Sequence, residues 1–204
     1  MLVGICGLIG SGKGAISDIL IEDHGFKPLS FASRLKDGVA AIFGWDRELL
    51  EGKTKESREW REQPDPFWSK EFGHAVTPRY TLQRVGTECM RVGFHDNIWI
   101  KLVENVIEND PNGNFVISDA RFPNEFDSIR SYGGEIWEVR RGEQPKWLID
   151  FRADDRNVPT DIHISEWAWV QSNPDSVIFN DATLEDLKIK VDTFINIAYY
   201  KTNK

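Results

Sequence analysis

The sequence has 204 residues, a formal net charge of −8 and two cysteines. This length suits one sizeable core, in one domain or two. The acidic balance disfavours binding to polymeric nucleic acid or to an anionic membrane surface. Two isolated cysteines do not make a disulfide framework, and we expect neither a signal peptide nor a membrane span. These features predict a protein of a reducing cytoplasm.

A glycine-rich motif begins at residue 7 and reads Gly7-Leu8-Ile9-Gly10-Ser11-Gly12-Lys13-Gly14. An apolar run precedes it and a helical pattern follows it, which is the context of a phosphate-binding P-loop. In such a loop, inward-turned backbone N–H groups and the helix dipole attract an anion. Lys13 adds a full charge for the β- and γ-phosphates. We therefore expect an ATP site formed by Ile9, Gly10, Ser11, Gly12, Lys13, Gly14 and Ala15.

The motif departs from the usual P-loop pattern at one position. A Ser or Thr that ligates Mg²⁺ normally follows the lysine, whereas Gly14 and Ala15 follow it here. Phosphate binding does not need that hydroxyl, but direct ligation of a metal by this loop does. The motif therefore predicts a phosphate site that supplies no metal ligand of its own.

Strand-like and helix-like segments alternate along the chain. We expect strands at residues 2–6, 26–31, 115–118, 135–139 and 177–179, and helices after residue 13, at 32–43, from 78, at 96–109, at 124–132 and after 183. This alternation predicts an α/β fold with three layers around a five-stranded parallel sheet. The helix from residue 78 should bury Leu82, Val85, Cys89 and Val92, and the next helix should bury Trp99, Leu102, Val103 and Val106.

Two segments lack such periodicity. Residues 45–78 are charged and punctuated by prolines, which predicts an inserted, partly mobile segment. Its aromatic residues either face a nucleobase or pin a long loop to the body: Trp60, Phe67, Trp68 and Phe72. Residues 142–165 hold Arg152 and Arg156 and are a candidate lid that closes over phosphates.

Charged residues follow several predicted strands, where open α/β sheets bind their ligands. Asp119 directly follows a buried apolar strand, and with a P-loop present this is the Walker B arrangement that holds Mg²⁺ or a metal-bound water. Arg34 and Lys36 are candidates for an acceptor phosphate, or belong to an ordinary solvated helix turn. Arg84 and Glu88 form either a salt-bridge ladder or a face turned toward substrate, and periodicity alone favours the ladder.

With these pieces placed, the chain resembles the nucleoside monophosphate kinases, and most closely the bacteriophage deoxynucleoside monophosphate kinases. The resemblance covers nearly the whole chain. Its most specific blocks are Gly86-Thr87-Glu88 and Asp119-Ala120-Arg121-Phe122-Pro123-Asn124-Glu125. Further matches lie in the P-loop, in Ser30-Phe31-Ala32 with Leu35-Lys36, in Thr77-Pro78-Arg79 to Arg91, in His163 to Glu166, and in Asn180-Asp181-Ala182-Thr183-Leu184.

The resemblance implies one P-loop kinase domain that transfers the γ-phosphoryl group of ATP to a deoxynucleoside monophosphate, with Mg²⁺. Its core would comprise residues 1–31, 110–141 and 166–204, with a helical monophosphate-binding insertion at about 32–109 and a lid at about 142–165. The family also suggests a homodimer, in the host-cell cytoplasm if a phage encodes it. Other partners would be ATP and the monophosphate, with no polymeric nucleic acid and no membrane.

The implied reaction needs no general base, because an acceptor phosphate is already anionic near neutral pH. Catalysis is then positioning and charge neutralisation. As catalytic residues we expect Lys13, Asp119 (holding the metal through water), Arg121, Arg152 and Arg156, with Arg140 and Arg141 in the same pool of lid arginines. The acceptor site would comprise Arg34, Lys36, Arg79, Gln83, Arg84, Glu88, Arg121, Asn124 and Glu125. Asn180 would border the adenine of ATP.

Two alternatives stay open on the sequence alone. The chain could be a P-loop kinase for another small phosphorylated acceptor, of the phosphomevalonate or dephospho-coenzyme A type. It could also be a non-catalytic nucleotide-binding protein whose loop has no metal-binding hydroxyl.

Overall fold

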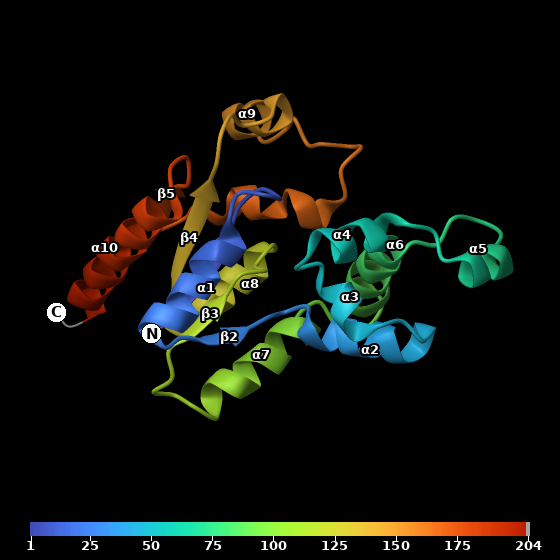
Figure 1. Ribbon diagram of the computed structural model, residues 1–204, viewed down its shortest axis with the longest axis horizontal. Helices are drawn as coiled ribbons and strands as arrows, with labels where there is room; N and C mark the ends of the chain where they lie inside the picture. The colour runs from blue at the N-terminus through green and yellow to red at the C-terminus, as the bar shows by residue number, and fades with distance from the viewer. Residues whose placement is uncertain (203–204) are drawn as a thin grey trace. The chain divides into compact units, whose positions relative to one another are not determined.

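The computed structural model describes residues 1–202. These residues form two compact units, drawn in Figure 1. The first unit comprises residues 1–30 and the chain from residue 104 onward, and it contains the whole sheet. The second unit comprises residues 31–103. No helix within residues 1–202 is both long enough and apolar enough to cross a membrane.

The first unit is built on a five-stranded parallel sheet, which confirms the predicted α/β class. Its strands are β1 (Leu2–Cys6), β2 (Lys27–Leu29), β3 (Phe115–Ile117), β4 (Glu135–Arg140) and β5 (Ser176–Phe179). Their order across the sheet is β2-β3-β1-β4-β5, and every neighbouring pair is parallel. The central strand β1 is buried along its length, as expected of a strand covered on both faces.

Helices cover both faces of this sheet. The unit contains α1 (Lys13–His24), α8 (Pro123–Ser131), α9 (Lys146–Ala153), α10 (Leu184–Thr202) and the end of α7 (Ile98–Glu108). Apolar side chains of α1 and α10, among them Leu20 and Val191, form a core cluster with Ile5 and Trp137 of the sheet. Against the other face, Ile129 of α8 packs so closely on β1 that Gly4 has no room for a Cβ atom. The core therefore extends through three layers, as predicted.

The second unit is helical over the residues that the structure describes. It contains α2 (Ser33–Phe43), α3 (Arg47–Glu51), α4 (Lys55–Glu62), α5 (Pro66–Phe72), α6 (Pro78–Gln83), a π-helix at Arg84–Val92 and the start of α7. The segment at residues 45–78, which shows little periodicity in the sequence, therefore forms short helices rather than strands. Capping residues start its three short helices: Asp46 accepts the N–H groups of Glu48 and Leu49, and Thr54 and Asp65 cap α4 and α5.

The tryptophans of this segment pack within the unit. Trp60 meets Trp45 edge to face at 6.1 Å, and the Trp68 indole N–H donates to the Phe43 carbonyl at 3.2 Å. Trp45 belongs to the small core of the unit, so these contacts favour the pinning role over contact with a base. Phe67, by contrast, is exposed.

The expected single α-helix from residue 78 changes to a π-helix at Arg84. A π-helix adds a residue to each turn, so positions further along the helix rotate out of the predicted face. Cys89 and Val92 were expected inside but are exposed, whereas Gly86 and Arg91 are buried. Leu102 and Val106 of α7 are likewise exposed, although Trp99 and Val103 are buried as predicted.

The candidate lid is more regular than its sequence suggests, because α9 occupies most of its first half. Two residues one helical turn apart, Leu148 and Phe151, are buried and hold this helix against the unit. Two short 3₁₀ helices follow at Ile164–Glu166 and Ala168–Ser172. In Figure 1, α9 lies beyond the arrowhead of β4, at the end of the sheet where parallel strands place a binding site.

Candidate active site

The P-loop connects β1 to α1 in the first unit, and its glycines are required by its shape. Gly7, Gly10 and Gly12 have φ angles of 137°, 80° and 102°, which side chains other than glycine rarely adopt. A Cβ atom on Gly7 would overlap the Val139 carbonyl, and one on Gly12 would overlap the Asn180 side chain. The backbone therefore makes the tight turn that a phosphate-cradling loop needs.

Asn180, predicted to border the adenine, lies against this loop. Its Nδ2 donates to the Ser11 carbonyl at 2.9 Å, which ties the loop to the residue that follows β5. The Ser11 side chain is buried, and its Oγ has no hydrogen-bond partner within the described part of the chain. Ile9, at the tip of the loop, is exposed.

Lys13 points back into its own loop. Its Nζ donates to the carbonyls of Gly7 at 2.9 Å and Leu8 at 2.8 Å. Burial, together with the positive charge of Arg121, lowers the pKa of Lys13 to about 8. A phosphate bound in the loop would place a negative charge beside this ammonium group.

Arg121 comes from the loop after β3 and lies on the P-loop side of the unit. Its Nη1 donates to Glu166 Oε1 at 2.8 Å and to the Ser165 carbonyl at 3.1 Å. The charge of Arg121 lowers the pKa of Lys13 and the charge of Glu166 raises it, so these three groups form one electrostatic cluster. Glu166 was not predicted as a site residue, because its role follows from its contact with Arg121, which lies far from it in the sequence.

Glu125 was expected to bind the acceptor, but in the structure its side chain binds backbone groups of its own turn. Its buried Oε2 accepts the backbone N–H groups of Arg121 at 2.7 Å and Phe122 at 3.1 Å, at the start of α8. These bonds fix the turn that carries Arg121. Asn124 lies beside Glu125 in the first turn of the same helix.

The residues around Asp119 suit a magnesium ion that arrives with a nucleotide. Asp119 Oδ2 accepts a hydrogen bond from Ser30 Oγ at 2.7 Å, where Ser30 follows β2. Carboxylate and hydroxyl oxygens are hard ligands, and Mg²⁺ commonly binds one or two carboxylates, waters and substrate phosphates. Within residues 1–202 no three His, Cys, Asp or Glu side chains are grouped to hold a metal by themselves. The donor set therefore fits a metal held jointly by Asp119, water and ATP.

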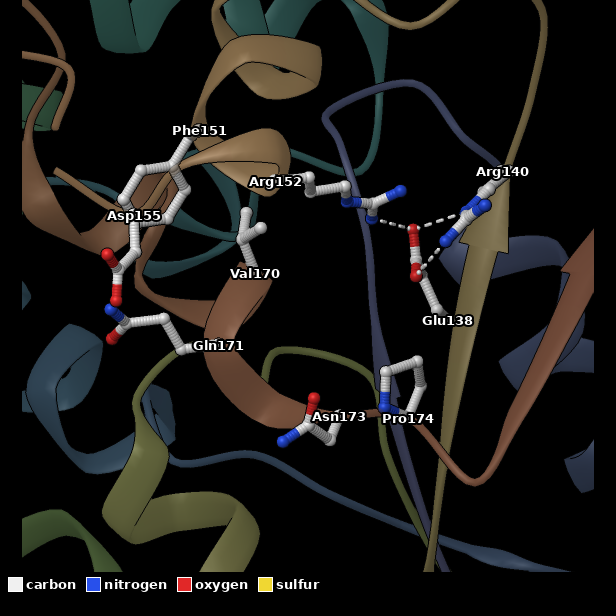
Figure 2. A pocket seen from close by; sticks show the side chains of 9 residues that line it. All are labelled: Glu138, Arg140, Phe151, Arg152, Asp155, Val170, Gln171, Asn173 and Pro174. Atoms are coloured by element: carbon white, nitrogen blue, oxygen red, sulfur yellow. Dashed lines mark hydrogen bonds and ion pairs between the residues drawn. The ribbon is translucent and has the colours of Figure 1, made fainter. Parts of the chain in front are cut away.

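The four lid arginines do not gather at one point. Arg140 and Arg152 both bind the carboxylate of Glu138, as Figure 2 shows. Arg156 instead binds its neighbour Asp154 at 2.6 Å and is highly exposed, and Arg141 is exposed. Hydrogen bonds from Arg156 lower the pKa of Asp154. Glu138 was missed from the sequence, although a charged residue inside an apolar strand is a visible signal.

The candidate acceptor residues of the second unit differ in burial and in their partners. Lys36 is largely buried and binds Glu51 at 2.7 Å, and Glu51 also accepts a hydrogen bond from Arg47. Burial would raise the pKa of Glu51, but the bonds from Lys36 and Arg47 lower it. Arg34 is exposed and binds Asp37 at 3.3 Å, while Arg79 lies 3.5 Å from Glu62. Gln83 is the last residue of α6, Arg84 begins the π-helix, and Glu88 lies at its middle.

Comparison with known proteins identifies the family. Residues 67–191 match the family of deoxynucleotide monophosphate kinases. A protein of Acanthamoeba polyphaga mimivirus assigned as a deoxynucleotide monophosphate kinase is 30% identical over 210 residues, covering 97% of each chain. The deoxynucleoside-5'-monophosphate kinase of Escherichia phage T5 is 27% identical over 179 residues, covering 64% of this chain and 72% of that protein.

The chain belongs to the deoxynucleotide monophosphate kinase family, within the P-loop kinases. This membership confirms the resemblance seen in the sequence. Among solved structures, a dephospho-CoA kinase from Campylobacter jejuni is 16% identical with a TM-score of 0.43, covering 97% of this chain and 96% of that one.

Proposed function

We propose that this protein transfers the γ-phosphoryl group of ATP to a deoxynucleoside monophosphate, giving ADP and a deoxynucleoside diphosphate. The observation that carries the proposal is the P-loop with its charge cluster of Lys13, Arg121 and Glu166, in a chain of the deoxynucleotide monophosphate kinase family. An anionic oxygen of the acceptor attacks the γ-phosphorus in line, and the bond to the β,γ-bridging oxygen breaks. No side chain needs to remove a proton.

The donor side of the site is assigned to the P-loop. Its backbone N–H groups and Lys13 would bind the β- and γ-phosphates, and Lys13 would exchange two loop carbonyls for phosphate oxygens. Asn180 would keep the loop in shape beside the adenine. Asp119, oriented by Ser30, would hold Mg²⁺ through water. The metal, when bound, neutralises charge on the phosphates.

Arg121 is assigned to the transferred phosphoryl group. Its charge acts on Lys13, and a planar guanidinium suits two phosphate oxygens at once. Glu166 and Glu125 would hold its side chain and its backbone, so we place Glu125 in a supporting role. Within the second unit, the residues assigned to the acceptor monophosphate are Arg34, Arg79, Gln83, Arg84 and Glu88, with Lys36 as a supporting ion pair.

An acceptor screen tests the proposal. ADP formation is measured with ATP and Mg²⁺ against every deoxy- and ribonucleoside monophosphate, and against dephospho-coenzyme A and phosphomevalonate. We expect ADP with at least one deoxynucleoside monophosphate and none with dephospho-coenzyme A or phosphomevalonate. ADP only with one of these last two acceptors would favour the other kinase type. ATP binding without ADP from any acceptor would favour a non-catalytic protein.

A further inference from the structure

A buried carboxylate lies in β4, outside the groups assigned to the reaction. Glu138 is 2% exposed, and its neighbours along the strand, Trp137 and Val139, face the apolar core on the opposite side of β4. An ionised carboxylate so far removed from water is costly unless cationic donors surround it. The groups that bind Glu138 therefore explain how a carboxylate can occupy this position.

Two arginines supply those donors, and Figure 2 shows the carboxylate between them. Arg140, two residues along the same strand, donates from Nε and Nη2 to both oxygens at 2.7 and 2.9 Å. Arg152, in the last turn of α9, donates from Nη2 to Oε1. Burial would raise the pKa of Glu138, but hydrogen bonds from both arginines lower it. Glu138 is therefore ionised and held by two elements.

One of the two arginines would be enough to neutralise the carboxylate. Arg140 already makes a bidentate pair with Glu138. The additional bond from Arg152 to Glu138 therefore serves to fix the end of α9. A pocket of about 320 Å³ borders the Arg152 side chain, so close packing does not fix it on that side. Its guanidinium lies 5.8 Å from the centre of the Trp169 ring. The bond to Glu138 is thus the directed contact that sets where the guanidinium lies.

This contact lies next to the start of the P-loop. Glu138 pairs in register with Cys6, the last residue of β1 before Gly7. Burial raises the pKa of the Cys6 thiol to about 12, and the charges of Glu138, Lys13 and Arg152 also act on that thiol. The lid arginine and the P-loop lysine therefore lie around the same strand end.

We propose that Glu138 is a positioning residue that holds Arg152 of α9 beside the P-loop, ready to meet the phosphates during transfer. This inference rests on the proposed function. A guanidinium has five N–H donors, and Arg152 engages Glu138 through Nη2, which leaves donors for phosphate oxygens. Glu138 itself touches no reacting atom.

A double-mutant cycle tests this role. Glu138→Gln keeps the shape of the side chain and removes its charge. It is measured in the wild-type background and in the Arg152→Met background. Glu135→Gln, which makes the same change at the first residue of β4, is the control. Readouts are kcat, both KM values and the melting temperature. We expect Glu138→Gln to lower kcat about tenfold in the wild-type background and less than about twofold in Arg152→Met, with both KM values nearly unchanged. Glu135→Gln should match the wild type in kcat.

Equal losses of kcat in both backgrounds would overturn the inference, as would a fall in melting temperature with kcat intact. If Glu138→Gln does not fold, Glu138→Asp carries the same cycle, because it keeps the charge and shortens the side chain by one methylene. A wild-type protein that phosphorylates no deoxynucleoside monophosphate would contradict the proposed function instead. An active wild type with additive effects contradicts only the role of Glu138.

Discussion

Lys13 carries an ammonium group whose charged form the folded protein disfavours. Burial and Arg121 lower its pKa to about 8, and a bound phosphate would raise that pKa again because it favours the charged form. ATP affinity should therefore be highest below pH 8 and fall as the pH rises above it, by at most about tenfold per pH unit.

Proton uptake checks this prediction directly. Near pH 8.5, calorimetric titration with ATP in two buffers of different ionisation enthalpy should reveal uptake of part of one proton. Lys13→Arg is the matched control, because arginine stays charged throughout this range. Equal uptake by the wild type and by Lys13→Arg would contradict the assignment of the titrating group to Lys13.

Gly14 differs from the other P-loop glycines in that nothing in the structure requires it. An added Cβ there would meet no atom within 4 Å, and its φ lies outside the left-handed region. Gly14→Ser should therefore fold normally and offer the hydroxyl that the loop lacks. We expect half-maximal activity at a lower Mg²⁺ concentration.

Gly14→Ala is the control for that substitution, since it adds the same Cβ without the hydroxyl. If both variants change the Mg²⁺ dependence alike, or if neither changes it, a hydroxyl at position 14 does not help to bind the metal. The account of Asp119, water and ATP as its ligands would then gain no support from the substitution.

At the scale of one element, the start of α8 depends on a single side chain. Glu125 accepts two backbone N–H groups while almost fully buried, so Glu125→Ala would leave them without that acceptor. We expect a loss of about 1–3 kcal/mol in the free energy of unfolding. Because the same turn carries Arg121, kcat should fall as well.

Glu125→Gln separates acceptor geometry from charge at this position. Its Oε1 can still accept both N–H groups, so stability and kcat should stay closer to the wild type than in Glu125→Ala. Urea unfolding and steady-state kinetics measure the two effects. A Gln variant as impaired as the Ala variant would mean that the charge of Glu125, and not its cap, is what the site needs.

Elements were predictable where their signals lie close together in the sequence. The P-loop, the apolar strands and the position of Asp119 after β3 are local patterns, and the structure contains each of them. Helices α3 to α5 were missed because five to eight residues show little periodicity, although Asp46, Thr54 and Asp65 were capping signals. The π-helix was missed because it changes which positions face inward without changing composition.

At the scale of the whole molecule, the parallel sheet and the family were predictable, and the long-range partners of charged residues were not. Glu138 meets Arg152 and Arg121 meets Glu166 only because the fold brings separate segments of the chain together. Sequence spacing carries no record of such pairs. The division of roles between the two units, the homodimer and the location in the cytoplasm stay predictions.

Transfer of labelled phosphate from γ-³²P-ATP to a deoxynucleoside monophosphate tests the central claim most directly. The wild type should form labelled deoxynucleoside diphosphate. Lys13→Met should lower kcat by about a hundredfold or more with an unchanged melting temperature, because it removes one preorganised cation from the transferred group. No labelled diphosphate from the wild type, or near-normal turnover by a folded Lys13→Met variant, would contradict the account.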